Sequence, residues 1–227
     1  MHRFFVDPSK MAGERFTLPD SIAHQVQSVL RLRDGDRLVL LPGDGTEAEC
    51  VLVAGSCEVV DRRSPATEPR HRLIVVQALL KGDGLDEVIR HATEVGVAGF
   101  QLVVTERCVA REISALRLER LRAIARESAE QSERALVPWV AAPIPLESVL
   151  EAGAVILADR TAPVRLSEIA PPSAVIIGPE GGWAVGELRG AGDANVALAS
   201  LGPRILRSRS VASVAAGVIL SRTGDFA

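Results

Sequence analysis

The sequence predicts an α/β protein in which a small β-barrel domain precedes a domain built on a mostly parallel sheet. From residue 69 onward, buried apolar strands alternate with helical patterns, which is typical of repeated β-α units. Before that point, short strands are joined by glycine turns, which favours a small barrel. The intervening stretch 62–70 is polar, contains prolines and has no hydrophobic periodicity. We therefore expect two domains, residues 1–68 and residues 69–227.

The first domain is expected to contain one short helix and three strands. Asp20 or Ser21 can cap the helix, because Ile22, Val26, Val29 and Leu30 recur at helical spacing after them. The strands are predicted over 37–41, 49–53 and 57–60, and a Pro-Gly-Asp-Gly turn joins the first two.

The second domain begins with two strand-helix units. A strand over 73–79 leads into a helix whose apolar face ends at Gly96, where a left-handed cap belongs. A strand over 100–104 precedes a long charged helix that opens at Ser114. Three further strands over 154–158, 174–177 and 195–199, followed by an apolar helix over 210–220, complete the predicted sheet domain.

Two glycine-bearing loops follow neighbouring strands of this predicted sheet. Gly178-Pro179-Glu180-Gly181-Gly182 follows the strand 174–177, and Ser200-Leu201-Gly202-Pro203 follows the strand 195–199. Open α/β sheets bind small ligands at the carboxyl edge, so the pair of loops predicts a ligand crevice there. A plain tight turn is the alternative for a lone glycine cluster. Neither loop has the spacing of the Walker or dinucleotide phosphate motifs.

The composition excludes several classes of protein. The net charge of −3 indicates no global nucleic-acid surface, and five Phe, two Trp and no Tyr argue against base stacking as the main recognition mode. Cys50, Cys57 and Cys108 have neither zinc-ligand spacing nor a disulfide pattern, so we expect no metal. The sequence shows no signal peptide and no membrane span, and we expect a reduced cytoplasmic location.

The two loops carry a resemblance to a known family. Strand-GPEGG followed by strand-LGPRILR resembles the ribosomal RNA small subunit methyltransferase E family, within the SPOUT class of knotted methyltransferases. Three other stretches resemble the same family: the opening with HQVQSVLRLRDGD, the segment KGDGLDEVIRHATEVGV, and EQSER followed by VP. The resemblance implies a trefoil-knotted domain after a PUA-like RNA-binding domain, S-adenosylmethionine as cofactor, and a homodimer. It implies methylation of N3 of a uridine in 16S ribosomal RNA of the small subunit.

The resemblance also implies roles for individual residues. Those expected to bind the cofactor are Leu157, Ile177, Gly178, Pro179, Glu180, Gly181, Gly182, Leu198, Ser200, Leu201, Gly202, Arg204, Ile205 and Leu206. Those expected to bind RNA are Arg3, His24, Arg31, Arg33, Lys81 and Arg134. We assign Glu180 as a base or orienter for the uracil N3 proton, and Arg204 or Arg207 as stabilisers of charge on the uracil oxygens.

Structural alternatives remain open at several of these positions. Arg31 and Arg33 can form ordinary ion pairs with Asp34 and Asp36, and Glu180 can bond neighbouring amides.

The chain departs from the family pattern at Arg209, where an acid is usual, and at His91, where a lysine is usual. A catalytically silent RNA-binding protein is therefore one alternative function, and a SPOUT-type methyltransferase acting on another RNA is a second, independent alternative.

Overall fold

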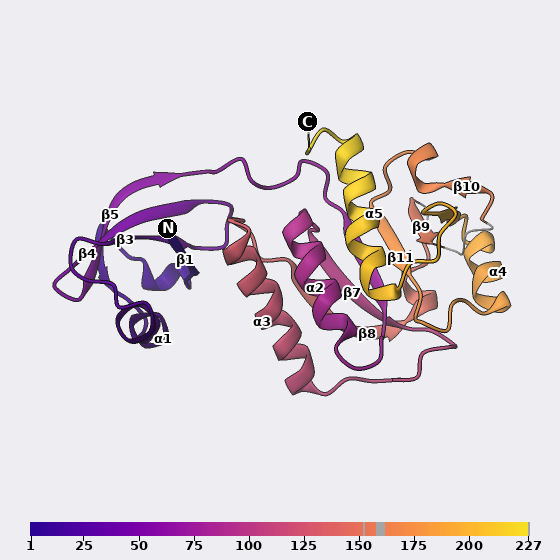
Figure 1. Cartoon of the computed structure of the whole chain (residues 1–227), viewed down its shortest axis with the longest axis horizontal. Helices are drawn as coiled ribbons and strands as arrows, with labels where there is room; N and C mark the ends of the chain where they lie inside the picture. The colour runs from indigo at the N-terminus through magenta and orange to yellow at the C-terminus, as the bar shows by residue number, and fades with distance from the viewer. Residues whose placement is uncertain (152, 158–161, 227) are drawn as a thin grey trace. The chain divides into compact units, whose positions relative to one another are not determined.

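Figure 1 shows the computed structural model of the chain, which describes residues 1–151, 153–157 and 162–226. The chain divides into two compact units. The first unit contains Met1–Glu68 together with Ala129–Val137, and the second contains Pro69–Ser128 and Pro138–Ala227. The segment Ala129–Val137 is the one part of the predicted second domain that lies in the first unit.

The first unit is built on a five-stranded sheet in the order β1-β3-β4-β5-β2. Its strands are β1 (His2–Phe5), β2 (Arg15–Thr17), β3 (Arg37–Leu41), β4 (Glu47–Val53) and β5 (Ser56–Arg63). Only β1 and β3 pair in parallel, and the other pairs are antiparallel. The hydrophobic core of this unit includes Phe4, Leu38 and Leu40 from the sheet, together with Val26.

The short helix of the first unit differs from the prediction at both ends. Helix α1 (Asp20–His24) has Pro19 at the N-cap and no side-chain cap, so neither Asp20 nor Ser21 caps it. It continues into a single π-helical turn, Gln25–Val29. A π turn widens the helix and shifts the residues that follow it around the axis. Val26 therefore stays buried, whereas Val29 is 64% exposed and leaves the predicted apolar face.

The second unit is built on a seven-stranded sheet in the order β10-β12-β9-β11-β6-β7-β8. All its pairs are parallel, which confirms the predicted α/β class. The strands are β6 (Ile74–Ala78), β7 (Gly99–Val104), β8 (Trp139–Pro145), β9 (Ala154–Leu157), β10 (Val164–Arg165), β11 (Ala174–Ile177) and β12 (Ala197–Ser200). The strand predicted over 154–158 is described to Leu157, and Ala158 lies outside the described residues.

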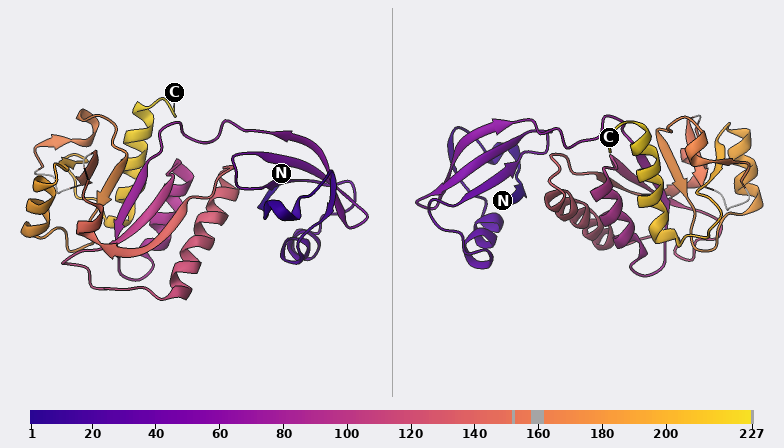
Figure 2. Two further views of the ribbon diagram at one scale, coloured as in Figure 1. Left: turned by 180° about the vertical axis from the view of Figure 1, so that it is seen from behind. Right: turned by 45° about the horizontal axis from the view of Figure 1, so that its top comes forward.

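Four helices complete the second unit. Among the described residues they are α2 (Gly84–Val95), α3 (Ala115–Gln131), α4 (Val185–Asp193) and α5 (Ser208–Arg222), and the last three residues of α3 belong to the first unit. Gly96 ends α2 in the predicted left-handed conformation, with φ at 111°. The Ser114 hydroxyl accepts a hydrogen bond from the Arg117 amide at 3.1 Å, which confirms that Ser114 opens α3. Helices α2 and α5 lie side by side in Figures 1 and 2.

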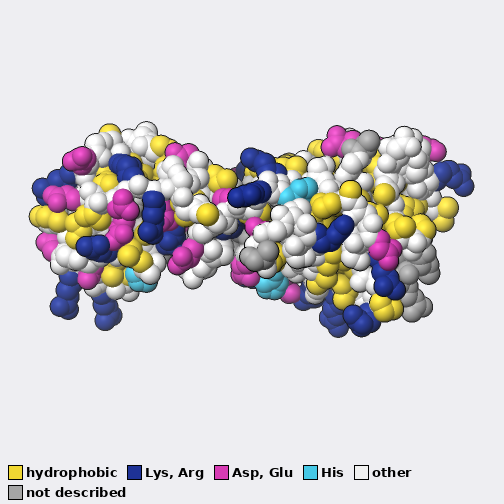
Figure 3. Space-filling view, turned by 90° about the horizontal axis from the view of Figure 1, so that it is seen from above, with side chains coloured by type: hydrophobic (Ala, Val, Ile, Leu, Met, Phe, Trp, Pro, Cys, Tyr) yellow, Lys and Arg dark blue, Asp and Glu magenta, His cyan; other side chains and the backbone are white. Residues whose placement is uncertain are grey.

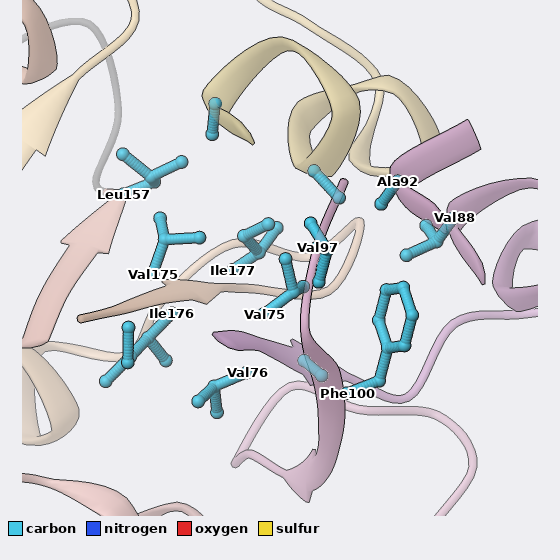
Figure 4. Close-up of a cluster of buried hydrophobic side chains, with 14 of the residues drawn as sticks. Val75, Val76, Val88, Ala92, Val97, Phe100, Leu157, Val175, Ile176 and Ile177 are labelled. Atoms are coloured by element: carbon cyan, nitrogen blue, oxygen red, sulfur yellow. The ribbon is translucent and has the colours of Figure 1, made fainter. Parts of the chain in front are cut away.

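The core of the second unit follows the alternation of a sheet that is covered on both faces. In Figure 4, Val75, Val175 and Ile177 point to the side of the sheet on which α2 and α5 lie, whereas Val76 and Ile176 point to the other side. All five side chains are buried. This packing fixes the relative positions of β6 and β11, and with them the loops that follow these strands.

No helix within the described parts of the chain is long and apolar enough to cross a membrane. The three cysteines are free and buried.

Candidate functional site

The two glycine-bearing loops meet at one cavity. Strands β9, β11 and β12 run parallel, with Leu157 in register with both Ile177 and Ala199. Their carboxyl ends therefore lie at the same edge of the sheet. A cavity of about 520 Å³ lies between the loops that follow them. This volume falls within the range of small-molecule sites.

The cavity brings together most of the residues predicted to bind the cofactor. They are Leu157, Ile177, Gly178, Pro179, Glu180, Gly182, Leu198, Leu201, Gly202, Arg204, Ile205 and Leu206. Gly181 and Ser200 do not line it, although both neighbour residues that do. Ser200 is buried, and its hydroxyl donates to the carbonyl of Val164 at 3.4 Å. Arg207 is exposed at the N-cap of α5 and does not line the cavity.

Sequence reasoning missed several lining residues. These are Arg107, Ala162, Pro163, Trp183, Leu188, Ser208 and Val211. Arg107 comes from the loop after β7, and nothing in the local sequence links it to loops more than seventy residues away. Trp183 directly follows the glycine loop, so its position in the sequence was an available signal.

The glycine loop is shaped by close contact with Trp183. The indole Nε1 donates to the Leu157 carbonyl at 2.8 Å, which ties the loop to the end of β9. A Cβ on Gly178 would lie 2.9 Å from Trp183 Cε2, so only glycine fits there without movement. Gly182 and Gly202 have φ values of 68° and 108°, a region that L side chains rarely adopt.

Two hydrogen bonds hold the glycine loop to its neighbours, and two more join the loop after β7 to the start of α4. The Glu180 carboxylate accepts from the Lys81 amide at 3.2 Å, at the end of β6. Arg107 Nη1 donates to the Gly181 carbonyl at 3.1 Å. Glu187 accepts from the amides of Glu106 and Ala184, at 2.7 and 2.8 Å, which joins the loop after β7 to the start of α4. The cavity is thus pre-formed by contacts between three strand ends.

Four cationic side chains at this edge have no acidic partner among the described residues. Arg107, Arg204, Arg207 and Lys81 are exposed, and none forms an ion pair within the described ranges. By contrast, the carboxylate of Asp86 on α2 does have cationic partners, because Arg117 and Arg120 contact it at 2.6 and 2.8 Å.

The other residues predicted to bind RNA lie in the first unit and fall into two groups. His24, Arg31 and Arg33 are exposed, and no side-chain ion pair is formed by Arg31 or Arg33 in the part of the chain that the structure describes. Arg31 adopts a left-handed conformation with φ at 55°, an uncommon state for a residue that carries a Cβ. The Arg33 amide donates to the Asp36 carboxylate at 2.7 Å, so the predicted contact with Asp36 involves the backbone only.

Arg3 and Arg134 form the second group, in which the side chains are little exposed and ion-paired. The Arg3 side chain is 7% exposed and pairs with the buried Glu47. Arg134 is buried and pairs with Glu68 at 2.7 Å, and Glu68 also accepts from the amides of Ala135 and Leu136. Both guanidinium groups therefore serve as internal counter-charges, because a buried cation requires a partner.

Glu47 is the centre of the charged cluster in the first unit. Burial acts to raise the pKa of this carboxyl, but hydrogen bonds from Arg63 and the charge of Arg3 outweigh it, so the pKa is lowered from its usual 4.5. The carboxyl therefore stays ionised inside the protein.

The two departures from the family pattern lie on helices α5 and α2. Arg209 Nη1 contacts Glu87 Oε1 at 2.6 Å and so joins α5 to α2. His91 is exposed on α2. Neither side chain lines the cavity, so Arg209 does not enter the space between the two loops.

A second cavity of about 650 Å³ lies between the ends of β7 and β8 and the first turns of α4. Its charged lining consists of Arg111 and three glutamates, Glu106, Glu147 and Glu187. No group of side chains within residues 1–151, 153–157 and 162–226 has the composition of a metal site.

Figure 3 shows basic and acidic side chains interspersed on the face that it displays, in agreement with the net charge of −3.

The family model and the relatives found by comparison with known proteins agree with one another. A family model described as an RNA methyltransferase domain matches residues 67–220. Ribosomal RNA small subunit methyltransferase E of Synechocystis is 34% identical over 229 residues, which cover 94% of this chain and 75% of the relative. The protein of the same name from Mycobacterium tuberculosis is 34% identical over 235 residues, which cover 95% and 90%.

A solved structure extends this likeness to the whole fold. The crystal structure of a ribosomal RNA small subunit methyltransferase E from Neisseria gonorrhoeae, bound to S-adenosyl methionine, superposes with a TM-score of 0.89. The two chains are 28% identical, and the match covers 98% of each.

Proposed function

The chain belongs to the ribosomal RNA small subunit methyltransferase E family, and on this premise we propose that it is an S-adenosylmethionine-dependent methyltransferase acting on N3 of a uridine in 16S ribosomal RNA. The observation that carries the proposal is the cavity between the two glycine-bearing loops at the carboxyl edge of the parallel sheet. The relative from Neisseria gonorrhoeae, whose structure contains this cofactor, shares the fold over nearly the whole chain.

The residues of the cavity fit the proposed cofactor. Its apolar lining from Leu157, Ile177 and Leu198 suits an adenine ring, and its glycines leave backbone amides and carbonyls accessible. When bound, S-adenosylmethionine supplies an electrophilic methyl group from its sulfonium centre. The protein then needs only to align the acceptor nitrogen with that methyl group, and alignment alone accounts for much of the acceleration in such displacements.

Two side chains at the cavity have suitable chemistry for the acceptor. Glu180 is the acidic residue among the described lining, and it can accept or orient the N3 proton while it also holds the Lys81 amide. Arg204 lines the cavity and is exposed, so it can stabilise charge on the uracil oxygens. Arg207 lies outside the lining, and the structure therefore favours Arg204 over Arg207 for this role.

Further properties belong to the same proposal. The order β10-β12-β9-β11 places the last strand between two earlier ones, which supports a knotted C-terminal segment. Val214 is exposed on the apolar helix α5, with Val211 and Val218 half-buried beside it, which supports a homodimer. The exposed Arg31 and Arg33 support a PUA-like, RNA-binding role for the first unit, with cytoplasmic ribosomal RNA as the partner.

A direct test combines two measurements on the full chain. Titration calorimetry measures binding of S-adenosylmethionine, and mass spectrometry of small-subunit ribosomal RNA after incubation with labelled cofactor locates any transferred methyl group. We expect saturable binding and a labelled N3-methyluridine. Binding of cofactor and RNA without transfer would instead identify a silent RNA-binding protein, whereas a label on another RNA would identify a methyltransferase of different specificity.

The role of Glu180 is tested separately with Glu180→Gln. Loss of turnover with cofactor affinity retained is expected if the carboxylate handles the N3 proton. Unchanged turnover would show that Glu180 serves only as the hydrogen-bond partner of Lys81.

A further inference from the structure

The structure places one charged residue at the cavity that neither the loop motifs nor the family pattern assigns. Arg107 lines the cavity beside Gly178, Glu180 and Gly182, although it comes from the loop after β7. In the sheet, β6 separates β7 from β11. Arg107 therefore reaches past the end of one strand to contact the loop that follows another.

The loop that carries Arg107 is held rigidly. Arg111 donates to the carbonyls of Thr105 and Glu106, each at 2.9 Å. Cys108 is buried, and its sulfur lies 3.2 Å from the Thr105 hydroxyl and 3.5 Å from the Leu79 carbonyl. The position of the Arg107 backbone is thus fixed before any ligand arrives, which lowers the entropic cost of using its side chain in binding.

The guanidinium group of Arg107 retains most of its binding capacity. A guanidinium carries five N–H donors, and one of them is used here, from Nη1 to the Gly181 carbonyl at 3.1 Å. The side chain forms no ion pair within the described residues, and it is exposed. The free donors therefore lie at the edge of the cavity with an unneutralised charge.

Two more unpaired cations lie along the same edge. Lys81 follows β6, and its amide donates to the Glu180 carboxylate. Arg204 follows β12 and lines the cavity. The loops after β6, β7 and β12 thus each contribute one cation without an ion pair among the described residues to the surroundings of one cavity, in a chain whose net charge is −3.

We propose that Arg107 binds a phosphate oxygen of the RNA next to the methylated nucleotide, and so positions that nucleotide at the cavity. This inference rests on the proposed function. An anionic oxygen is the ligand that a planar guanidinium suits best, through paired N–H donors. The carboxylate of the cofactor is the other source of such an oxygen. The exposure of Arg107, and its origin outside both cofactor loops, favour the RNA.

The test compares three variants of the full chain with a matched control. Arg107→Ala removes the group, Arg107→Lys keeps the charge without the planar fork, and Arg107→Gln removes the charge but keeps an N–H donor for the Gly181 carbonyl. The control is Arg90→Ala, because Arg90 is an exposed arginine on α2 that does not line the cavity. The measurements are cofactor affinity by calorimetry, affinity for small-subunit ribosomal RNA over a series of salt concentrations, and kcat and KM for methyl transfer.

For a phosphate contact, we expect Arg107→Gln to weaken RNA binding about tenfold. The plot of log affinity against log salt concentration should become less steep, its negative slope decreasing in magnitude by about 1. Cofactor affinity should stay within about twofold of the wild-type value, since the contact is made with RNA. Arg107→Lys should keep the slope, and Arg90→Ala should change nothing.

Two results would overturn the inference. A wild-type salt slope in Arg107→Gln would show that no phosphate is bound, and a loss of cofactor affinity with unchanged RNA binding would assign Arg107 to the cofactor carboxylate or to the glycine loop. Wild-type protein that transfers no methyl group to this RNA would instead refute the proposed function itself. If Arg107→Ala fails to fold, the Gln and Lys variants decide the question.

Discussion

Two pairs of arginines, one in each unit, lie in contrasting surroundings. In the first unit, the side chains of Arg3 and Arg134 are only 7% and 4% exposed and pair with Glu47 and Glu68. At the carboxyl edge of the second unit, Arg107 and Arg204 are exposed and have no acidic partner in the described chain. A buried guanidinium needs a counter-charge within the protein. A guanidinium that binds an external anion must instead have no carboxylate of the protein already neutralising it. Residue type alone therefore does not distinguish a structural arginine from a functional one.

The largest expected effect breaks the buried pair in the first unit. Glu47→Gln leaves the buried Arg3 guanidinium with only the exposed Glu133, 3.8 Å away, as a counter-charge, and we expect the free energy of unfolding to fall by about 3–5 kcal/mol. Chemical denaturation followed by circular dichroism measures this loss. Glu49→Gln is the matched control, because Glu49 pairs with Arg37, whose side chain is 59% exposed, and its loss should cost no more than about 1 kcal/mol.

The same pair also makes the free energy of unfolding of the wild-type protein fall at acid pH. The pKa of Glu47 is lower in the folded protein than its usual 4.5. Its contribution to the free energy of unfolding is therefore complete above pH 4.5, and it is lost as the pH falls through the pKa of the folded state. The Gln variant should lack this part of the pH dependence. Equal losses in Glu47→Gln and Glu49→Gln would contradict the contrast between buried and exposed pairs.

A smaller effect is expected at the cavity of the second unit. The Cβ of Gly178→Ala would lie 2.9 Å from Trp183 Cε2, so the indole must move, and we expect the affinity for S-adenosylmethionine to fall about tenfold. Calorimetry measures the affinity. Gly186→Ala is the control, because a Cβ there would have no atom within 4 Å and should leave the affinity unchanged. An unaltered affinity in Gly178→Ala would show that Trp183 does not shape the binding site.

The smallest expected effect concerns Arg209, an arginine of the second unit that does have a partner. Its ion pair with Glu87 is about half exposed at the arginine, so Arg209→Ala should lower the free energy of unfolding by less than about 1 kcal/mol. Cofactor affinity and methyl transfer should persist, since Arg209 does not line the cavity. Loss of cofactor binding in this variant, measured by calorimetry, would show that the residue at this departure from the family pattern affects the binding site.

The sequence determined the features that depend on local periodicity and on loop chemistry. Apolar runs predicted the buried parallel strands β6, β7, β9 and β11, because a strand covered on both faces has no polar side; only Gln77 in β6 and Gln101 in β7 interrupt these runs. The glycines after β11 and β12 predicted open loops at the carboxyl edge, and Gly96 predicted the end of α2. The strand predicted over 195–199 starts two residues late, because Asn195 adopts a left-handed conformation with φ at 56° in the turn after α4.

Only the tertiary structure decided which charges are free and which residues complete the cavity. Glu68 and Arg134 are 66 residues apart, and Arg107 and Gly181 are 74 apart, so no local pattern records either contact. The helical spacing at Val29 predicted burial, yet the π turn rotates that residue into solvent. Local sequence sets the shape of each element, whereas the neutralisation of a charge depends on what the fold brings beside it.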